Sequence, residues 1–301
     1  MKNKSLFLPI LLGSLLLAAN LVAQTVPDLT IKCGDVKVKG AVETDAYAVN
    51  NKNAIAGDYV DSSNVQHGMI LKGKVLTTFD GPTGSSTIAA YGLNTVGVAV
   101  GWYVDSTGVN QGFAFANGTL TSFNYPGAGT GSGQGTQNNG INDPGWIVGN
   151  FFDKSGVQHG FYWDTTTFHK VDAPNASATA VWAINNNKLM TVWEIDTSGV
   201  YHSFLYDGTT FTPMDVPGAA QSVVHGINNK GDLDYTIFDS SSNRHGVLYQ
   251  ATSGNFTQFD DPKGANTTRA DGINDKDKMV GRYSPSSGTP ANAGFKCTVK
   301  P

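Results

Sequence analysis

Gly140-Ile141-Asn142-Asp143-Pro144-Gly145-Trp146-Ile147-Val148-Gly149 is one copy of a motif that runs through most of the sequence. Each copy has a small residue, an aliphatic residue and an asparagine. The asparagines follow one another at spacings of 43 to 48 residues, as Asn50, Asn94, Asn142, Asn185, Asn228 and Asn274. Most copies also carry an aspartate 11 residues after this asparagine and a histidine 17 residues after it. Agreement at several fixed offsets predicts six copies of one structural unit.

Within a copy, the sequence predicts four short strands separated by polar turns. Ala180–Ile184 exemplifies the first strand, Ile147–Phe152 the second, Gln158–Trp163 the third and Phe168–Asp172 the fourth. These runs are rich in aromatic and β-branched residues and are bounded by Asn, Asp, Gly and Pro, which is typical of hairpins. A four-stranded unit of about 45 residues is the size of a propeller blade. We therefore predict an all-β fold, a six-bladed β-propeller in a single domain over residues 24–301.

The two ends of the chain are expected to meet in the last blade. The sixth copy stops after its third strand, whereas residues 30–36 stand where the fourth strand of a preceding blade belongs. This N-terminal strand would complete blade six and close the ring. Cys33 and Cys297 would then be cross-strand partners, and we predict that they form a disulfide.

Composition agrees with a turn-rich β protein. The 301 residues include 36 Gly, and acidic residues are almost all Asp, with Glu43 and Glu194 as the two glutamates. This balance argues against long helices. A net charge of -4 offers no electrostatic footprint for nucleic acid.

The N-terminus has the features of an export signal. Lys2 and Lys4 precede an apolar run that ends near Ala23, which predicts a signal peptide over residues 1–23. An uncleaved anchor helix is the alternative. After cleavage we expect no stable membrane insertion and a secreted, extracellular or cell-surface location.

Two strings resemble a known repeat family. They are residues 140–149 and Asp-Lys-Ser-Gly-Val-Gln-His-Gly-Phe, residues 153–161, and they resemble the bacterial extracellular HAF repeat family, named for a His-Ala-Phe triplet. Here the triplet is His159-Gly160-Phe161, and copies four and five depart from the pattern at Val192 and Tyr235, where other copies have Gly. The resemblance implies a secreted or surface-associated bacterial protein and brings no catalytic residue with it.

Residues that recur in every copy are expected to be structural. The repeated aspartate can accept backbone N–H bonds in a turn. Equivalent histidines would stand on the order of 15 Å apart around the ring, too far to share a metal, so we expect core histidines. No metal site and no cofactor are predicted.

The positions that differ between copies are better candidates for a site. Three residues before each repeated asparagine stand Tyr47, Tyr91, Asn139, Trp182, His225 and Asp271. On the innermost strands these side chains are expected to ring one mouth of the central channel. Aromatic faces combined with amide, imidazole and carboxylate groups suit a sugar or another polar ring compound. The alternative is that they only fill the channel neck.

A catalytic alternative rests on carboxylates. Asp271 with Glu194 or Asp234 could form a glycosidase pair, which needs a separation of roughly 5–10 Å. No motif enforces such a pair. The sequence thus predicts a secreted, monomeric propeller that binds a carbohydrate or another extracellular partner. A glycan-cleaving enzyme and a purely structural surface protein are the alternatives.

Overall fold

The computed structural model describes residues 29–264, 266–285 and 292–300, so the predicted signal peptide lies outside the described residues. The described residues form the following strands: β1 (Thr30–Val36), β2 (Glu43–Val49), β3 (Ala54–Val60), β4 (Gln66–Lys72), β5 (Val75–Phe79), β6 (Thr87–Leu93), β7 (Ala99–Val104), β8 (Asn110–Ala116), β9 (Thr119–Ser122), β10 (Gly135–Ile141), β11 (Ile147–Phe152), β12 (Gln158–Trp163), β13 (Phe168–Val171), β14 (Ala178–Ile184), β15 (Met190–Ile195), β16 (Tyr201–Tyr206), β17 (Phe211–Pro213), β18 (Gln221–Ile227), β19 (Leu233–Phe238), β20 (Arg244–Gln250), β21 (Asn255–Phe259), β22 (Arg269–Ile273), β23 (Lys278–Tyr283) and β24 (Ala293–Lys300). None of the described segments forms a helix long and apolar enough to cross a membrane.

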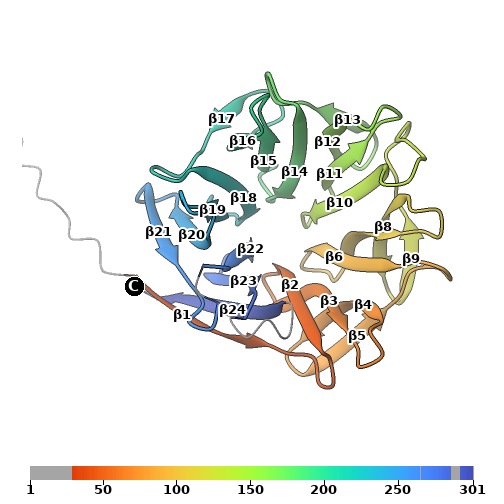
Figure 1. Ribbon diagram of the computed structural model, residues 1–301, viewed down its shortest axis with the longest axis horizontal. Coiled ribbons are helices and arrows are strands. Elements are labelled where there is room, and N and C mark those ends of the chain that lie inside the picture. Colours follow the sequence, from red (N-terminus) through yellow and green to blue (C-terminus); the bar gives the residue numbers. More distant parts are fainter. Residues whose placement is uncertain (1–28, 265, 286–291, 301) are drawn as a thin grey trace, which may run out of the picture.

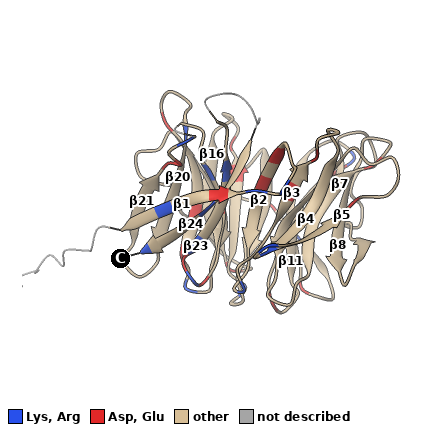
Figure 2. Ribbon diagram, turned by 90° about the horizontal axis from the view of Figure 1, so that it is seen from below, with Lys and Arg blue, Asp and Glu red and all other residues tan. Residues whose placement is uncertain are grey.

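The strands form six antiparallel blades around a central axis (Figure 1). Blades one to five follow chain order as β2–β5, β6–β9, β10–β13, β14–β17 and β18–β21, and blade six consists of β22, β23, β24 and β1. The first strand of each blade lies next to the axis (Figure 1). Seen from the side, the strands run between two faces of a disc, with turns at both (Figure 2). The predicted six-bladed β-propeller is confirmed.

Blade six is assembled from both ends of the chain. Strands β1 and β24 pair antiparallel, with Thr30 opposite Lys300 and Cys33 opposite Cys297. The two cysteines form a disulfide across 264 residues of sequence, with their Cα atoms 4.0 Å apart. Both the closing strand and the disulfide are therefore confirmed as predicted.

The repeated asparagines form a closed circle of hydrogen bonds at one face, which we call the asparagine face. Each Nδ2 donates to the backbone carbonyl of the equivalent asparagine in the next blade. The donor–acceptor distances, beginning with the bond from Asn50 to Asn94 and following the ring, are 2.9, 3.4, 3.1, 3.1, 3.3 and 2.8 Å. The last bond runs from Asn274 back to Asn50. The circle ties every blade to both of its neighbours.

The same asparagines also hold their own turns. Asn185 Oδ1, for example, accepts the N–H groups of Asn187 and Leu189, each at 3.0 Å. A side chain with one donor and one acceptor group is needed to do both tasks, and asparagine has both. This explains why asparagine recurs in all six copies.

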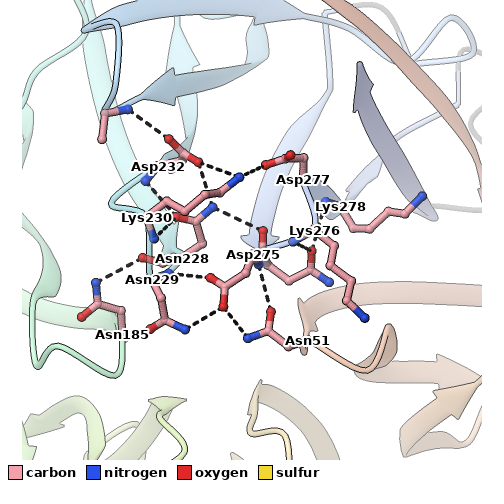
Figure 3. Close-up of polar contacts among 12 residues, drawn as sticks. Asn51, Asn185, Asn228, Asn229, Lys230, Asp232, Asp275, Lys276, Asp277 and Lys278 are labelled. Carbon is pink, nitrogen blue, oxygen red and sulfur yellow. Dashed lines mark hydrogen bonds and ion pairs between the residues drawn. The ribbon is translucent and has the colours of Figure 1, made fainter. Parts of the chain in front are cut away.

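The residues that follow these asparagines form a second, incomplete circle. Backbone N–H groups donate to side-chain oxygens of the next blade from Thr95 to Asp143, Asp143 to Asn186, Asn186 to Asn229, Asn229 to Asp275 and Asp275 to Asn51. Figure 3 shows Asp275 bonded to both Asn51 and Asn229. Among the described residues no such bond joins Asn51 to Thr95, the one member of this set without a carboxamide or carboxylate.

The apolar core lies between neighbouring blades. Phe79 at the end of blade one, for instance, packs against Phe115 and Phe113 of blade two, with ring centroids 4.2 and 5.7 Å away. Each blade therefore buries its faces only against its neighbours, which is why a closed ring is stable where a single blade is not.

In blades one, three, four and five, the repeated aspartate and histidine meet near the face opposite the asparagines. Asp61 Oδ1 accepts the N–H groups of Ser63 and Val65, which confirms the predicted turn role. His67 joins this aspartate to the strand end, with Nδ1 2.6 Å from Asp80 and Nε2 3.5 Å from Asp61. Equivalent bridges occur at His159, His202 and His245, whose side chains are 16, 36 and 11% exposed. His67, His159 and His202 are partly exposed bridging residues, so the expectation of core histidines is wrong for these three, whereas His245 is buried.

Candidate functional site

Each of the six predicted ring residues sits at a β-bulge of its innermost strand. The pairing with the second strand shifts register around Tyr47, Tyr91, Asn139, Trp182 and Asp271, and around His225 together with Gly226. A bulge leaves an extra residue unpaired and redirects its side chain. The same irregularity in all six blades places the copies' most variable residues next to the axis.

The ring residues lie inside the channel, beyond the asparagine face. Tyr47, Tyr91, Asn139, Trp182 and Asp271 line a cavity of about 100 Å³. The cavity is small because the aromatic rings pack on one another. The centroid of Tyr91 is 4.3 Å from that of Tyr47 and 5.9 Å from that of Trp182. A space of this size holds a few water molecules and is too small for a sugar ring.

His225 differs from the other five because it turns toward a neighbouring pocket. Its Nδ1 lies 2.7 Å from the backbone oxygen of Ala270, and its ring centroid is 5.0 Å from Trp182. Burial lowers the pKa of His225 to about 3. The imidazole is therefore neutral at physiological pH and donates its Nδ1 proton to the carbonyl.

Two further variable positions in each blade accompany the ring residue. One stands two residues before it on the first strand, and the other lies directly opposite that residue on the second strand. Residues directly opposite across two strands share a face. The resulting variable triplets, from blade one to blade six, are Asp45/Tyr47/Asp58, Ala89/Tyr91/Trp102, Gln137/Asn139/Asn150, Ala180/Trp182/Trp193, Val223/His225/Thr236 and Arg269/Asp271/Arg282.

Each variable triplet has its own chemistry. In blade three, Asn139 donates to Asn150 Oδ1 at 2.9 Å, and Asn150 donates to Gln137 Oε1 at 3.0 Å. In blade two, Tyr91 stacks on Trp102 with centroids 5.8 Å apart. The channel wall is thus amide-rich in one sector and aromatic in another.

Blades one and six bring opposite charges together. The Arg282 guanidinium lies 4.6 Å from the centroid of the Tyr47 ring and 3.8 Å from Asp271 Oδ2. Tyr47 in turn donates to Asp45 Oδ2 at 3.1 Å. Burial raises the pKa of both Asp45 and Asp271, while the positive charge of Arg282 opposes that rise.

A pocket over blades four to six, which we call the arginine–aromatic pocket, adjoins the ring residues. It has a volume of about 250 Å³. Its lining residues are Trp182, Trp193, Tyr201 and Phe238, the three arginines Arg244, Arg269 and Arg282, and Val223, His225 and Thr236. Trp182 and His225 connect it to the ring of bulge residues. Two of the six predicted ligand-binding residues therefore belong to this pocket.

Several polar groups of the pocket residues have no partner among the described residues. Trp193 Nε1, Thr236 Oγ1 and Arg282 Nη1 are buried and form no hydrogen bond there. Buried donors without partners are rare in proteins, and such groups mark a place for a ligand or ordered water. The pocket thus offers aromatic faces beside unused donors.

The carboxylates considered for catalysis do not line one common cavity near the channel. Asp271 lines the channel cavity, but neither Asp234 nor Glu194 does. Glu194 lies opposite His202 on the next strand, and burial raises its pKa. Asp234 is fully buried and accepts the N–H of Gly226 at 2.6 Å.

Asp234 has a structural counterpart in the neighbouring blade. Thr191 Oγ1 accepts the N–H of Ala183 at 2.9 Å, which is the same bulge N–H one blade earlier. Burial raises the pKa of Asp234 to about 8, and the negative charge of Asp271 adds to this rise. Asp234 therefore completes the bulge as a mostly protonated acid at neutral pH.

The three arginines were not among the sequence candidates. Arg282 and Trp193 stand eight residues after the repeated asparagine, where the other copies have Asp58, Trp102, Asn150 and Thr236. This position varies between copies as much as the ring position does, so its variation could have identified it as a candidate site position from the sequence. Among the described residues no group of three or more His, Cys, Asp and Glu side chains is placed to hold a metal ion.

Fold and site together define a six-bladed β-propeller with one arginine-rich, aromatic pocket beside its channel. No protein-family model matches the sequence, and no curated protein matches it significantly. The resemblance to HAF repeats therefore stays a prediction.

Solved structures share the fold at low sequence identity. The SapL1 lectin, solved in complex with alpha methyl fucoside, is 9% identical, with 86% of this chain and 95% of that chain covered and a TM-score of 0.55. TolB from Acinetobacter baumannii is 12% identical, with 82% and 65% covered and a TM-score of 0.55. AofleA from Arthrobotrys oligospora is 10% identical, with 89% and 82% covered and a TM-score of 0.50. These likenesses concern the fold.

Proposed function

We propose that this protein is a carbohydrate-binding propeller that holds one sugar ring in the arginine–aromatic pocket. The observation that carries the proposal is a cavity of about 250 Å³ whose walls combine four aromatic side chains with unused hydrogen-bond donors. Apolar C–H faces of a sugar pack on aromatic rings, and its hydroxyls need polar partners. The volume lies just below the range of roughly 300–1,000 Å³ for drug-sized ligands, which suits a single sugar.

Two further points support this class of ligand. A lectin solved with alpha methyl fucoside has the same fold. In addition, the ring residues Trp182 and His225, which variability in the sequence singles out, lie in the pocket wall. We place the remaining ring residues, Tyr47, Tyr91, Asn139 and Asp271, behind the ligand as its support rather than in direct contact with it.

The proposal includes an extracellular site of action. The disulfide between Cys33 and Cys297 is typical of oxidising compartments. The signal-like residues 1–23 and the HAF-like strings agree with export and with a bacterial surface or secreted repeat protein. We propose that the protein is exported and meets its glycan outside the cell.

A binding experiment with matched tryptophan variants tests the proposal. The purified protein is screened on a glycan array, and hits are measured by calorimetry with wild type, Trp193→Ala and Trp146→Ala. Trp193 lines the pocket, whereas Trp146 stacks on Tyr162 in blade three, away from it. We expect Trp193→Ala to lose at least tenfold in affinity, about 1.4 kcal/mol, and Trp146→Ala to bind normally.

Tyr201→Ala is a second pocket variant in case Trp193→Ala does not fold. The proposal is wrong if the wild-type protein binds no glycan. It is also wrong if both folded pocket variants bind as tightly as wild type.

A further inference from the structure

All the arginines of this protein lie in one place. The sequence contains 20 basic residues, and only Arg244, Arg269 and Arg282 are arginines; the others are lysines. All three line the arginine–aromatic pocket, and no lysine does. Arginine differs from lysine in its planar fork of donors, which matches a carboxylate in a bidentate manner. The segregation of arginine from lysine therefore points to a chemical requirement of the pocket.

The arginines are brought close by strand pairing. Arg269 and Arg282 are directly opposite each other on β22 and β23, and Arg244 comes from the start of β20 in the preceding blade five. Like charges directly opposite on a sheet are destabilising. Burial, together with the positive charges of Arg282 and Arg244, lowers the pKa of Arg269. The fold thus brings three positive charges together in a partly buried pocket, where their mutual repulsion destabilises the protein.

Among the described residues, one of the three arginines forms an ion pair. Arg282 lies 3.8 Å from Asp271, and Arg244 lies over the face of Phe238 at 5.5 Å. Within residues 29–264, 266–285 and 292–300, neither Arg244 nor Arg269 forms an ion pair. None of the three guanidinium groups donates a hydrogen bond within those ranges. The sequence between Pro285 and Asn292 contains no acidic residue.

The remaining charged neighbours do not change this balance. Asp271, Asp45, Asp58 and Glu43 all lie within reach of the positive charge of Arg282, and Arg269 also acts on Asp271 and Asp45. Burial raises the pKa of all four acids, which opposes the negative charge that would neutralise the arginines. His225, at the pocket wall, is neutral at physiological pH because burial lowers its pKa. Buried charge of one sign is stable only when a partner of the other sign is present.

We propose that the sugar bound in this pocket is acidic, a uronic acid or another sugar that carries a carboxylate. Arg269 and Arg244 receive the carboxylate, and the aromatic wall of Trp193 and Tyr201 receives the sugar ring. This inference rests on the proposed carbohydrate-binding function and adds the charge of the ligand to it. A neutral sugar would leave the two unpaired guanidinium groups as they are.

Calorimetry with paired probes tests the inference. The probes are glucuronic and galacturonic acid, their methyl esters, and glucose and galactose. We expect at least one acid to bind ten or more times as tightly as its ester and its neutral sugar. Arg269→Gln should remove that preference and leave the weak affinity for neutral sugars. Lys154→Gln, which removes an exposed charge near the Asp153 turn, is the matched control and should not change it.

The outcomes separate the two proposals. Equal affinity for acids, esters and neutral sugars overturns the acidic ligand and leaves carbohydrate binding standing. If acetate binds as tightly as the sugar acids, the pocket recognises only the carboxylate, and the proposal that it binds a sugar ring is wrong. A sulfated sugar that binds more tightly than any uronic acid overturns the carboxylate. Near-ultraviolet circular dichroism checks folding, and Arg244→Gln replaces Arg269→Gln if that variant is unfolded.

Discussion

The asparagine face and the opposite end of the channel are built from the same six repeats in contrasting ways. At the asparagine face one residue type recurs in all blades, and its bonds go to backbone carbonyls of the next blade. At the variable triplets each blade has different residues, and most contacts run between side chains. Backbone groups are the same in every copy, so bonds to them need one residue type. Positions that do not bond to the backbone of the next blade can vary, and their side chains are available to bind a ligand.

The largest expected loss of stability comes from replacing Arg282, the buried cation among the variable triplets. Arg282→Met removes the ion pair of the buried Asp271 and leaves Asp45 with Arg269 as its remaining nearby cation, which costs about 3–5 kcal/mol of unfolding free energy at pH 7.5. Burial already raises the pKa of both acids, and loss of Arg282 raises it further. Both therefore take up protons as the pH falls, and the loss should shrink by pH 5. Urea unfolding at the two pH values measures this.

Arg282→Lys is the control for charge, because it keeps the cation but not the planar fork. It should lose less stability than Arg282→Met at pH 7.5. A loss that is equal at pH 7.5 and pH 5 would show that packing, and not charge, explains the effect.

The next effect comes from opening the asparagine circle. Asn185→Ala removes one bond to the next blade and two within its turn, at roughly 1 kcal/mol each. We expect a loss of about 2–4 kcal/mol in urea unfolding, with unchanged affinity for the pocket ligand. Asn186→Ala, one residue on in the exposed second circle, should lose less than about 1 kcal/mol. Equal losses for the two variants would contradict the structural role of the circle.

The smallest expected effect concerns Asp234. This residue differs between the copies, yet it has a structural role because it accepts the N–H of Gly226. Asp234 has a pKa raised to about 8, so its contribution to stability is complete below pH 4 and is lost as pH rises toward 8. Asp234→Asn keeps an acceptor for Gly226 and cannot ionise. It should match wild type at pH 5 and exceed it by at least about 1 kcal/mol at pH 8.5, since one pKa unit equals about 1.4 kcal/mol. Thermal unfolding over this range is the measurement, and a loss at every pH would refute it.

The sequence could reveal the ring because spacing and register carry that information. Six asparagines at similar spacings give the blade count, and the missing fourth strand of the sixth copy explains both β1 and the bond between Cys33 and Cys297. The pairing needed no contact information, since register alone puts the two cysteines on neighbouring strands.

The site was harder to predict because the sequence of a single repeat does not show where a β-bulge lies or which residues face each other across strands. The position of Trp182 as a variable inner residue could be found, but not its turn toward Trp193, which stands 11 residues later in the sequence. Arg244 comes from yet another strand of the next blade. Its nearness to Arg269 follows from how blades five and six pack, which no periodicity within a repeat encodes.

The chain order of blade six has a consequence for how the protein is made. Its outermost strand is synthesised first and its inner strands last, so β1 waits for about the whole length of the protein before its partner β24 exists. Until then the growing molecule is an open arc with exposed strand edges, which invite pairing with other chains. Completion of blade six is therefore a late event, and a chain that lacked β1 or β24 would leave this blade unfinished.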